Sequence, residues 1–104
     1  MVLTKDTILA KLKSFKTIYQ KEGFLIKGLF GSYARDEAKE GSDIDVLVEA
    51  TPKFASKYGF GAIERIKNIE AELSSSFGTP VHLSDSSGMD KTAKKFIIDR
   101  AIYV

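Results

Sequence analysis

Segments with helical periodicity alternate along this chain with short apolar segments, and that alternation limits the class of fold it can adopt. Residues 6–21 and 62–77 repeat apolar side chains at spacings of three and four, which is typical of amphipathic helices. Residues 24–30 are almost continuously apolar, as in a buried strand. In residues 43–49 and 80–84 apolar and polar side chains alternate, which indicates two further strands.

The segments between these elements complete the predicted order. Residues 33–39 are expected to form a short helix, and residues 51–61 a loop, because a proline and two glycines interrupt them. A polar loop and a last helix follow the third strand. The order helix, strand, helix, strand, helix, strand, helix predicts one α/β domain over residues 1–104, in which helices cover a small sheet.

The composition excludes several classes of site. With no cysteine among its 104 residues, the chain has no disulfide, zinc-thiolate site or thiol nucleophile, and the reducing cytoplasm is the expected location. Its apolar runs fall short of the roughly 20 residues that span a bilayer, and its start does not resemble a signal peptide. The net charge of +2 is too small for a surface that coats nucleic acid. We therefore expect neither membrane nor direct nucleic-acid binding.

Two aspartates alternate with apolar residues at the start of the second predicted strand. Successive side chains of a strand point to opposite faces, so Asp43 and Asp45 share one face, about 7 Å apart, while Ile44 and Val46 face the core. Two carboxylates on one face suit Mg²⁺, which prefers oxygen ligands and completes its shell with water and phosphate oxygens. The same pattern alone also fits an amphipathic strand with an exposed polar face.

A glycine-serine pair lies between the first strand and the acids. Gly31 allows a ligand to approach the backbone closely, Ser32 adds a hydroxyl, and a following helix would point its N-terminus at a phosphate. An ordinary turn followed by a helix N-cap explains the dipeptide equally well when it is taken alone.

Together these residues resemble a known signature. Gly31-Ser32, ten further residues and then Asp43-Ile44-Asp45 are similar to the motif of the polymerase-beta-like nucleotidyltransferase superfamily. The fuller runs Gly-Ser-Tyr-Ala-Arg and Ser-Asp-Ile-Asp-Val-Leu-Val resemble its minimal branch, the MntA-type antitoxins. The resemblance implies an α/β (α+β) core with a mixed sheet. It also implies transfer of AMP from ATP to a hydroxyl of a HEPN-type toxin, with Asp43 and Asp45 binding two Mg²⁺ ions and Gly31 and Ser32 binding the triphosphate.

The chain departs from this family on the third strand, where members usually carry another catalytic acid. His82 takes that place, and imidazole is a poor Mg²⁺ ligand. It could act as a general base, or it could mark a site whose acid has been lost. Asp85 is a candidate replacement carboxylate. Arg35 could contact the phosphates, or pair with Asp36 or Asp43 as a structural ion pair.

Two functions are therefore open. One is an active, metal-dependent protein adenylyltransferase. The other is a catalytically weakened, nucleotide-binding antitoxin that silences its partner by occlusion. In the second case Phe54, Tyr58 and Phe60 could anchor an exposed interface, although packing within the chain is the simpler role for them.

Overall fold

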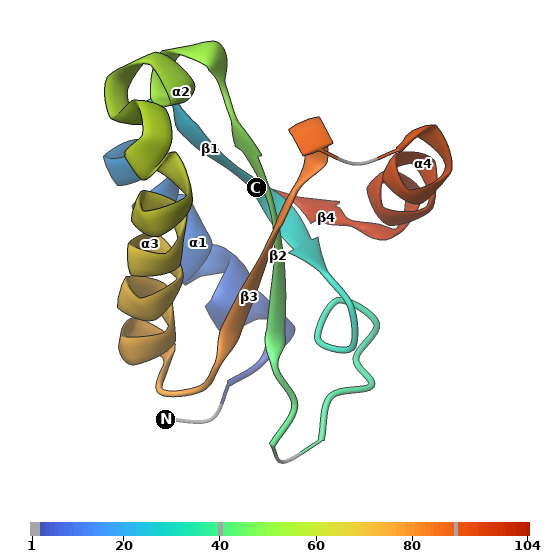
Figure 1. Ribbon diagram of the computed structural model, residues 1–104. Coiled ribbons are helices and arrows are strands. Elements are labelled where there is room, and N and C mark those ends of the chain that lie inside the picture. The colour runs from blue at the N-terminus through green and yellow to red at the C-terminus, as the bar shows by residue number, and fades with distance from the viewer. Residues whose placement is uncertain (1–2, 40, 89) are drawn as a thin grey trace.

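A mixed sheet lies at the centre of the computed structural model, which describes residues 3–39, 41–88 and 90–104 (Figure 1). In the described part of the chain the strand order is β3-β2-β1-β4. The strands are β1 (Phe24–Phe30), β2 (Ile44–Ala50), β3 (Val81–Asp85) and β4 (Ile102–Tyr103). β1 runs antiparallel to β2 and β4, whereas β2 and β3 are parallel. This mixed α/β arrangement confirms the predicted fold class.

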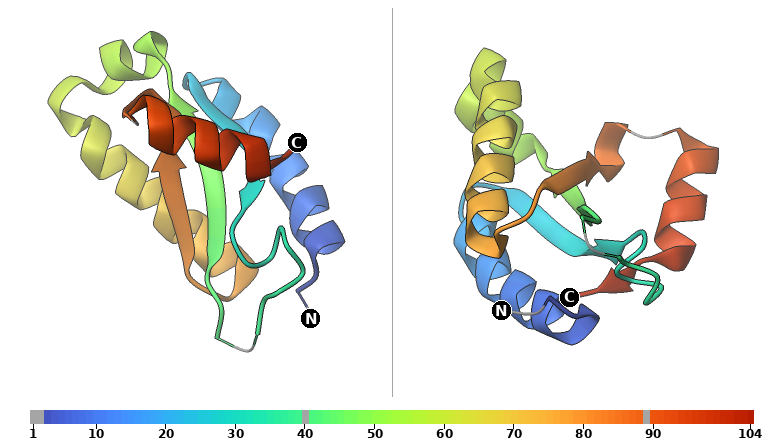
Figure 2. Two further views of the ribbon diagram at one scale, coloured as in Figure 1. Left: turned by 90° about the vertical axis from the view of Figure 1, so that its right-hand side faces the viewer. Right: turned by 90° about the horizontal axis from the view of Figure 1, so that it is seen from below.

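Helices lie on both sides of this sheet, as the view from below shows most clearly (Figure 2). α1 (Lys5–Gln20) and α3 (Ala62–Phe77) are on one side, and α4 (Lys91–Arg100) is on the other. A capping box of Thr4 and Thr7 begins α1, and Gly78 in the left-handed conformation ends α3. The sequence therefore carries the signals that begin and end these two helices.

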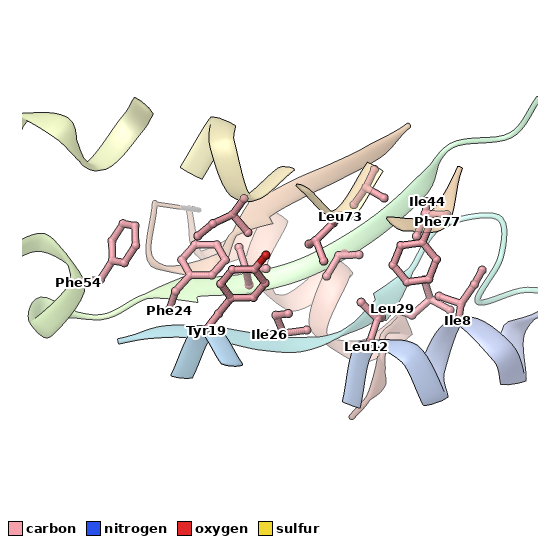
Figure 3. Packing of buried hydrophobic residues seen from close by; sticks show 14 residues of the cluster. Ile8, Leu12, Tyr19, Phe24, Ile26, Leu29, Ile44, Phe54, Leu73 and Phe77 are labelled. Carbon is pink, nitrogen blue, oxygen red and sulfur yellow. The ribbon is translucent and has the colours of Figure 1, made fainter. Parts of the chain in front are cut away.

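The hydrophobic core fills the space between the sheet and the pair α1 and α3 (Figure 3). Strand side chains alternate into it, and the helices contribute their apolar stripes. Its fully buried members include Ile8, Leu12, Phe24, Leu29, Ile44, Val46, Val48, Phe54, Ile69 and Leu73. Leu47 points from β2 to the opposite face and is also fully buried. Both faces of β2 are thus covered, which makes it a rigid support for the polar residues at its start.

Two of the predicted segments differ from the structure. Residues 33–39 form turns and irregular chain instead of a helix, because the bonds there close tight turns and Asp36 has a left-handed φ of 56°. Residues 51–61 contain α2 (Pro52–Tyr58) and a short 3-10 helix (Gly59–Gly61) instead of a loop. Pro52 occupies the first turn of α2, where its fixed φ favours a helix start.

The last strand was not predicted at all. β4 is two residues long and pairs with Gly28 and Leu29 of β1, and Val104 continues the contact by donating its N–H to the Lys27 carbonyl at 3.0 Å.

None of the helices in the described ranges combines the length and apolar character needed to cross a membrane.

Candidate functional site

The pairing of three strands brings the predicted site residues together. Asp43 lies immediately before β2, and Asp45 is its second residue. The parallel register places Asp45 beside His82 of β3, and the antiparallel register places it beside Phe30, the last residue of β1. Gly31 follows Phe30 directly. The two acids therefore lie beside both the glycine-serine turn and the histidine, at the end of the sheet where β2 begins.

Gly31 and Asp45 are in direct contact. Gly31 has a φ of +80°, which favours glycine, and a Cβ added there would overlap Asp45 Oδ2 and lie 3.0 Å from its Cγ. Only a residue without a side chain leaves room for this carboxylate. The glycine is thus explained by the acid it adjoins, and the turn and the acids form one site.

His82 binds the other acid. Its Nε2 lies 2.8 Å from Asp43 Oδ2, and both side chains are about half exposed, at 56% and 44%. The hydrogen bond to Asp43 is the main cause of a raised pKa of the His82 imidazole, which favours its charged form. The pKa of Asp45 is also raised, mainly by its partial burial, while the nearby His82 opposes that rise. The site thus places two carboxylates around one imidazole.

The loop that follows Gly31 is held in place by local bonds. The Gly31 carbonyl accepts from Arg35 N–H at 3.2 Å, and the Ser32 carbonyl accepts from Glu37 N–H at 2.8 Å. Lys5 Nζ donates to Asp36 Oδ2 at 3.0 Å and ties the loop to α1. Because no helix begins here, the expected helix N-terminus is absent from this described loop, and any phosphate would meet turn backbone and the half-buried Ser32 instead.

Arg35 pairs with neither of the acids considered for it in the sequence. Its Nε donates to Glu37 Oε2 at 3.0 Å, and both side chains are exposed. It nevertheless lies close enough to Asp45 to lower the pKa of that carboxyl slightly against the other causes. Arg35 is therefore a cation at the rim of the site, held by a weak surface pair that a phosphate could replace.

Asp85 does not replace the missing acid. It lies opposite Val48 near the far end of β2, and its Oδ1 accepts from Ala50 N–H at 3.2 Å and from the backbone and hydroxyl of Ser87. An odd separation from His82 along the strand also turns it toward the other face of the sheet. The expectation that Asp85 reaches the site is wrong.

Two residues of α3 that the sequence reasoning overlooked hold β3 in position. Glu70 Oε2 accepts from Leu83 N–H at 3.0 Å, and Ser74 Oγ accepts from Val81 N–H at 2.9 Å. These bonds flank His82 and satisfy the outer edge of the strand. No signal in the sequence identifies β3 as an edge strand, so neither residue could have been found from it.

The donor set fits Mg²⁺ in part. Asp43 and Asp45 offer hard carboxylate oxygens, and Mg²⁺ commonly binds one or two carboxylates together with phosphate oxygens and water. No cluster of three or more histidine, cysteine, aspartate or glutamate residues suited to a metal occurs within the described ranges. Metal binding here would therefore depend on the nucleotide phosphates for further ligands.

Comparison with known proteins is consistent with this geometry. Residues 12–104 match the family of nucleotidyltransferase domains. The chain is 30% identical over 101 residues to the protein adenylyltransferase MntA of Thermococcus cleftensis, covering 92% of this chain and 95% of that protein. A solved structure assigned as a minimal nucleotidyltransferase superposes with a TM-score of 0.75 at 22% identity, covering 98% and 97% of the two chains. A toxin-antitoxin crystal structure with AMP-PNP gives 0.60 at 17%, covering 97% of this chain and 72% of that one.

Proposed function

Because the chain belongs to the family of nucleotidyltransferase domains, as a minimal nucleotidyltransferase, we propose that it transfers AMP from ATP to a hydroxyl of a partner protein. The observation that carries this proposal is the contact between Gly31 and Asp45, which joins the glycine-serine turn to a pair of carboxylates. The relative named as a protein adenylyltransferase supports a protein as the acceptor.

The transfer is a single in-line displacement. The acceptor hydroxyl oxygen forms a bond to the α-phosphorus of ATP, the bond from that phosphorus to the bridging oxygen breaks, and pyrophosphate leaves with the electron pair. Gly31, Ser32 and Arg35 bind and orient the triphosphate, while Asp43 and Asp45 would hold two Mg²⁺ ions. Mg²⁺ bound there would neutralise charge on the phosphates. His82 would accept the hydroxyl proton at Nε2 in its neutral form, after the nucleotide complex breaks the bond to Asp43 and Nε2 has lost its own proton to solvent.

A protein acceptor suits the exposure of the site. The side chains of Asp43 and His82 are about half exposed, so a hydroxyl on a large molecule can approach them from solvent. We further propose that the partner is a HEPN-type toxin, and that the protein acts on it in the cytoplasm. The toxin-antitoxin structure with a similar fold supports the class of partner but not its type.

One observation favours a second function. His82 stands where a third acid would serve, and it bonds to an oxygen of Asp43 that a metal would need. The alternative is therefore a catalytically weakened antitoxin that binds nucleotide and silences its partner by occlusion.

Labelled ATP distinguishes the two functions. The protein is incubated with Mg²⁺, ATP labelled at the α-phosphate and the protein encoded by the adjacent gene. Transfer predicts label on that protein, reduced about a hundredfold or more by Asp43→Asn or Asp45→Asn. Asp85→Asn, a change of a carboxylate on the same sheet but away from the site, should leave labelling intact.

The opposite result would be an unlabelled partner that the Asp43→Asn and Asp45→Asn proteins still neutralise, which would establish occlusion. Substitutions of His82 then define its role. His82→Ala lowers kcat if the imidazole takes the proton, whereas a large gain in kcat for His82→Asp would show that the native histidine limits the site.

A further inference from the structure

An unsupported aromatic ring projects from the corner between α2 and α3. Phe60 lies between Gly59 and Gly61 and is fully exposed, at 108%, and Ile63 on the first turn of α3 is 70% exposed. We call this surface the Phe60 corner and include in it three exposed lysines, Lys53, Lys57 and Lys67. Because these large apolar side chains are exposed, they add no burial free energy to the fold of the chain itself.

The support beneath the Phe60 corner is firmly packed. Phe54 of α2 is fully buried against Phe24 and Tyr58. Arg65 donates to Glu22 at 2.7 Å, and the Tyr58 hydroxyl bonds to the same carboxylate. These contacts join the end of α1, α2 and the start of α3. The exposed ring is therefore displayed on a fixed base, which lowers the entropy lost when a partner binds it.

The net charge of the Phe60 corner is positive, because its three lysines outnumber the exposed Glu64 that follows Ile63. In the part of the chain that the structure describes, no carboxylate lies within ion-pair distance of Lys53, Lys57 or Lys67. Lys67 follows Ile63 by four residues on α3 and so lies on the same side of the helix. Two exposed apolar side chains with a mainly cationic surround are complementary to an apolar pocket with carboxylates at its edge.

The Phe60 corner and the nucleotide site are at opposite ends of β2. Asp43 and Asp45 are at the start of that strand, whereas α2 begins two residues after its last residue, Ala50 (Figure 1). Seven residues of strand extend about 20 Å. A partner seated on the corner therefore leaves the half-exposed acids accessible.

We propose that the Phe60 corner is the docking surface for the protein acceptor, which receives Phe60 and Ile63 in an apolar pocket edged by carboxylates. This inference rests on the proposed function. Docking and transfer are then separate: the corner holds the acceptor, and another part of the acceptor brings its hydroxyl to the site. Changes at the corner alter KM, and changes at Asp43 or Asp45 alter kcat.

The test measures binding and transfer independently, with the protein encoded by the adjacent gene as the probe. Asp45→Asn protein is titrated with that probe by calorimetry, with and without Phe60→Ala and Ile63→Ala. The double change should raise Kd about tenfold or more, and in the active protein it should raise KM alike while kcat stays within about twofold. Lys57→Glu with Lys67→Glu should weaken binding, whereas Lys13→Glu on α1 and Tyr103→Ala on β4 should not.

Failure of the docking proposal and failure of the transfer proposal give different results. Unchanged binding by the Phe60→Ala, Ile63→Ala protein, with labelling of the probe intact, would overturn the docking surface and leave transfer standing. Binding that depends on Phe60 without any labelling would overturn transfer and leave docking standing. A probe that does not bind the Asp45→Asn protein at all would overturn the docking proposal. Thermal unfolding should be unchanged by Phe60→Ala, because the ring is fully exposed.

Discussion

Asp45 restricts position 31 to glycine, since its carboxylate occupies the space that a side chain on the turn would need. The same contact explains how residues 14 positions apart in the sequence act as one site. Around it, Asp43 and His82 add a second carboxylate and an imidazole, joined by a 2.8 Å bond. At the scale of single residues, the proposed chemistry depends on these few contacts, and two substitutions test them.

Gly31→Ala should reduce AMP transfer about tenfold or more, because the added methyl group displaces Asp45 from its position. Its matched control is Gly41→Ala. Gly41 also has a positive φ, of 87°, but has no described atom within 4 Å of an added Cβ. Both changes should lower the free energy of unfolding by about 1 kcal/mol from backbone strain. Transfer assays should separate them, and an equal loss of activity in both would show that steric displacement is not the cause.

Asp45→Asn should reduce transfer about a hundredfold or more while leaving the fold at least as stable as before. Burial raises the pKa of Asp45, so the folded state disfavours its ionised form and stability falls as the pH rises through that pKa. Asparagine removes this penalty at neutral pH. Melting temperatures measured at pH 7 should be equal or higher for the variant. A clear fall would mean that the carboxylate supports the fold as well as the chemistry.

At the scale of elements, a cluster of ion pairs and hydrogen bonds joins α1, α2 and α3. Arg65 of α3 bonds to Glu22 at 2.7 Å and to Glu72 at 3.1 Å, and Tyr19 of α1 donates its hydroxyl to Glu72 at 2.7 Å. Glu22 and Arg65 are mostly buried, at 15% and 21% exposure. Ion pairs in such positions are strongly coupled to packing, so removing one partner leaves the other charge unpaired.

The Arg65 hydrogen bond lowers the pKa of Glu22 from 4.5 to about 2. A lowered carboxyl pKa adds stability that is present above the ordinary pKa and lost as the pH falls from about 4.5 toward 2. Glu22→Gln should therefore lower the free energy of unfolding at pH 7 by about 2 kcal/mol and show less acid destabilisation over that window. Urea titrations at several pH values measure both. Glu64→Gln, an exposed change on α3, should leave the free energy of unfolding at pH 7 unchanged.

Across the whole molecule, one core connects the sheet with α1, α2 and α3. The proposed nucleotide site and the Phe60 corner lie at opposite ends of it. Such an arrangement predicts that the chain unfolds as one unit, and the single domain predicted over residues 1–104 leads to the same expectation. It also allows the two surfaces to evolve separately, because neither shares its residues with the other.

Phe54→Ala should test this cooperativity. The ring is fully buried, so its loss should lower the free energy of unfolding by about 3–5 kcal/mol. Far-ultraviolet dichroism and tyrosine fluorescence should shift together, in one transition. Phe60→Ala, the same chemical change six residues away at full exposure, should shift neither signal. Two separate transitions in the parent protein would contradict a single folding unit.

The sequence by itself determined the elements whose signals are local. Periodicity located α1 and α3, the apolar run located β1, and the spacing of Gly31, Asp43 and Asp45 identified the family. The carboxylates were expected to share one face, and strand geometry alone is sufficient for that expectation. Local signals were misleading in two segments. Residues 33–39 form turns instead of the expected helix, and Pro52 begins α2 where a loop was expected.

Only the tertiary structure decided which residues meet across long separations. In the structure His82 bonds to Asp43, and Asp85 bonds to Ala50 and Ser87. Glu70 accepts a hydrogen bond from the edge of β3. The tertiary structure also separated two aromatic side chains of one segment, burying Phe54 and exposing Phe60. The physical reason is that hydrogen bonds and burial depend on partners that strand order and register bring together. Strand order and register cannot be inferred from the spacing of residues that are neighbours in the sequence.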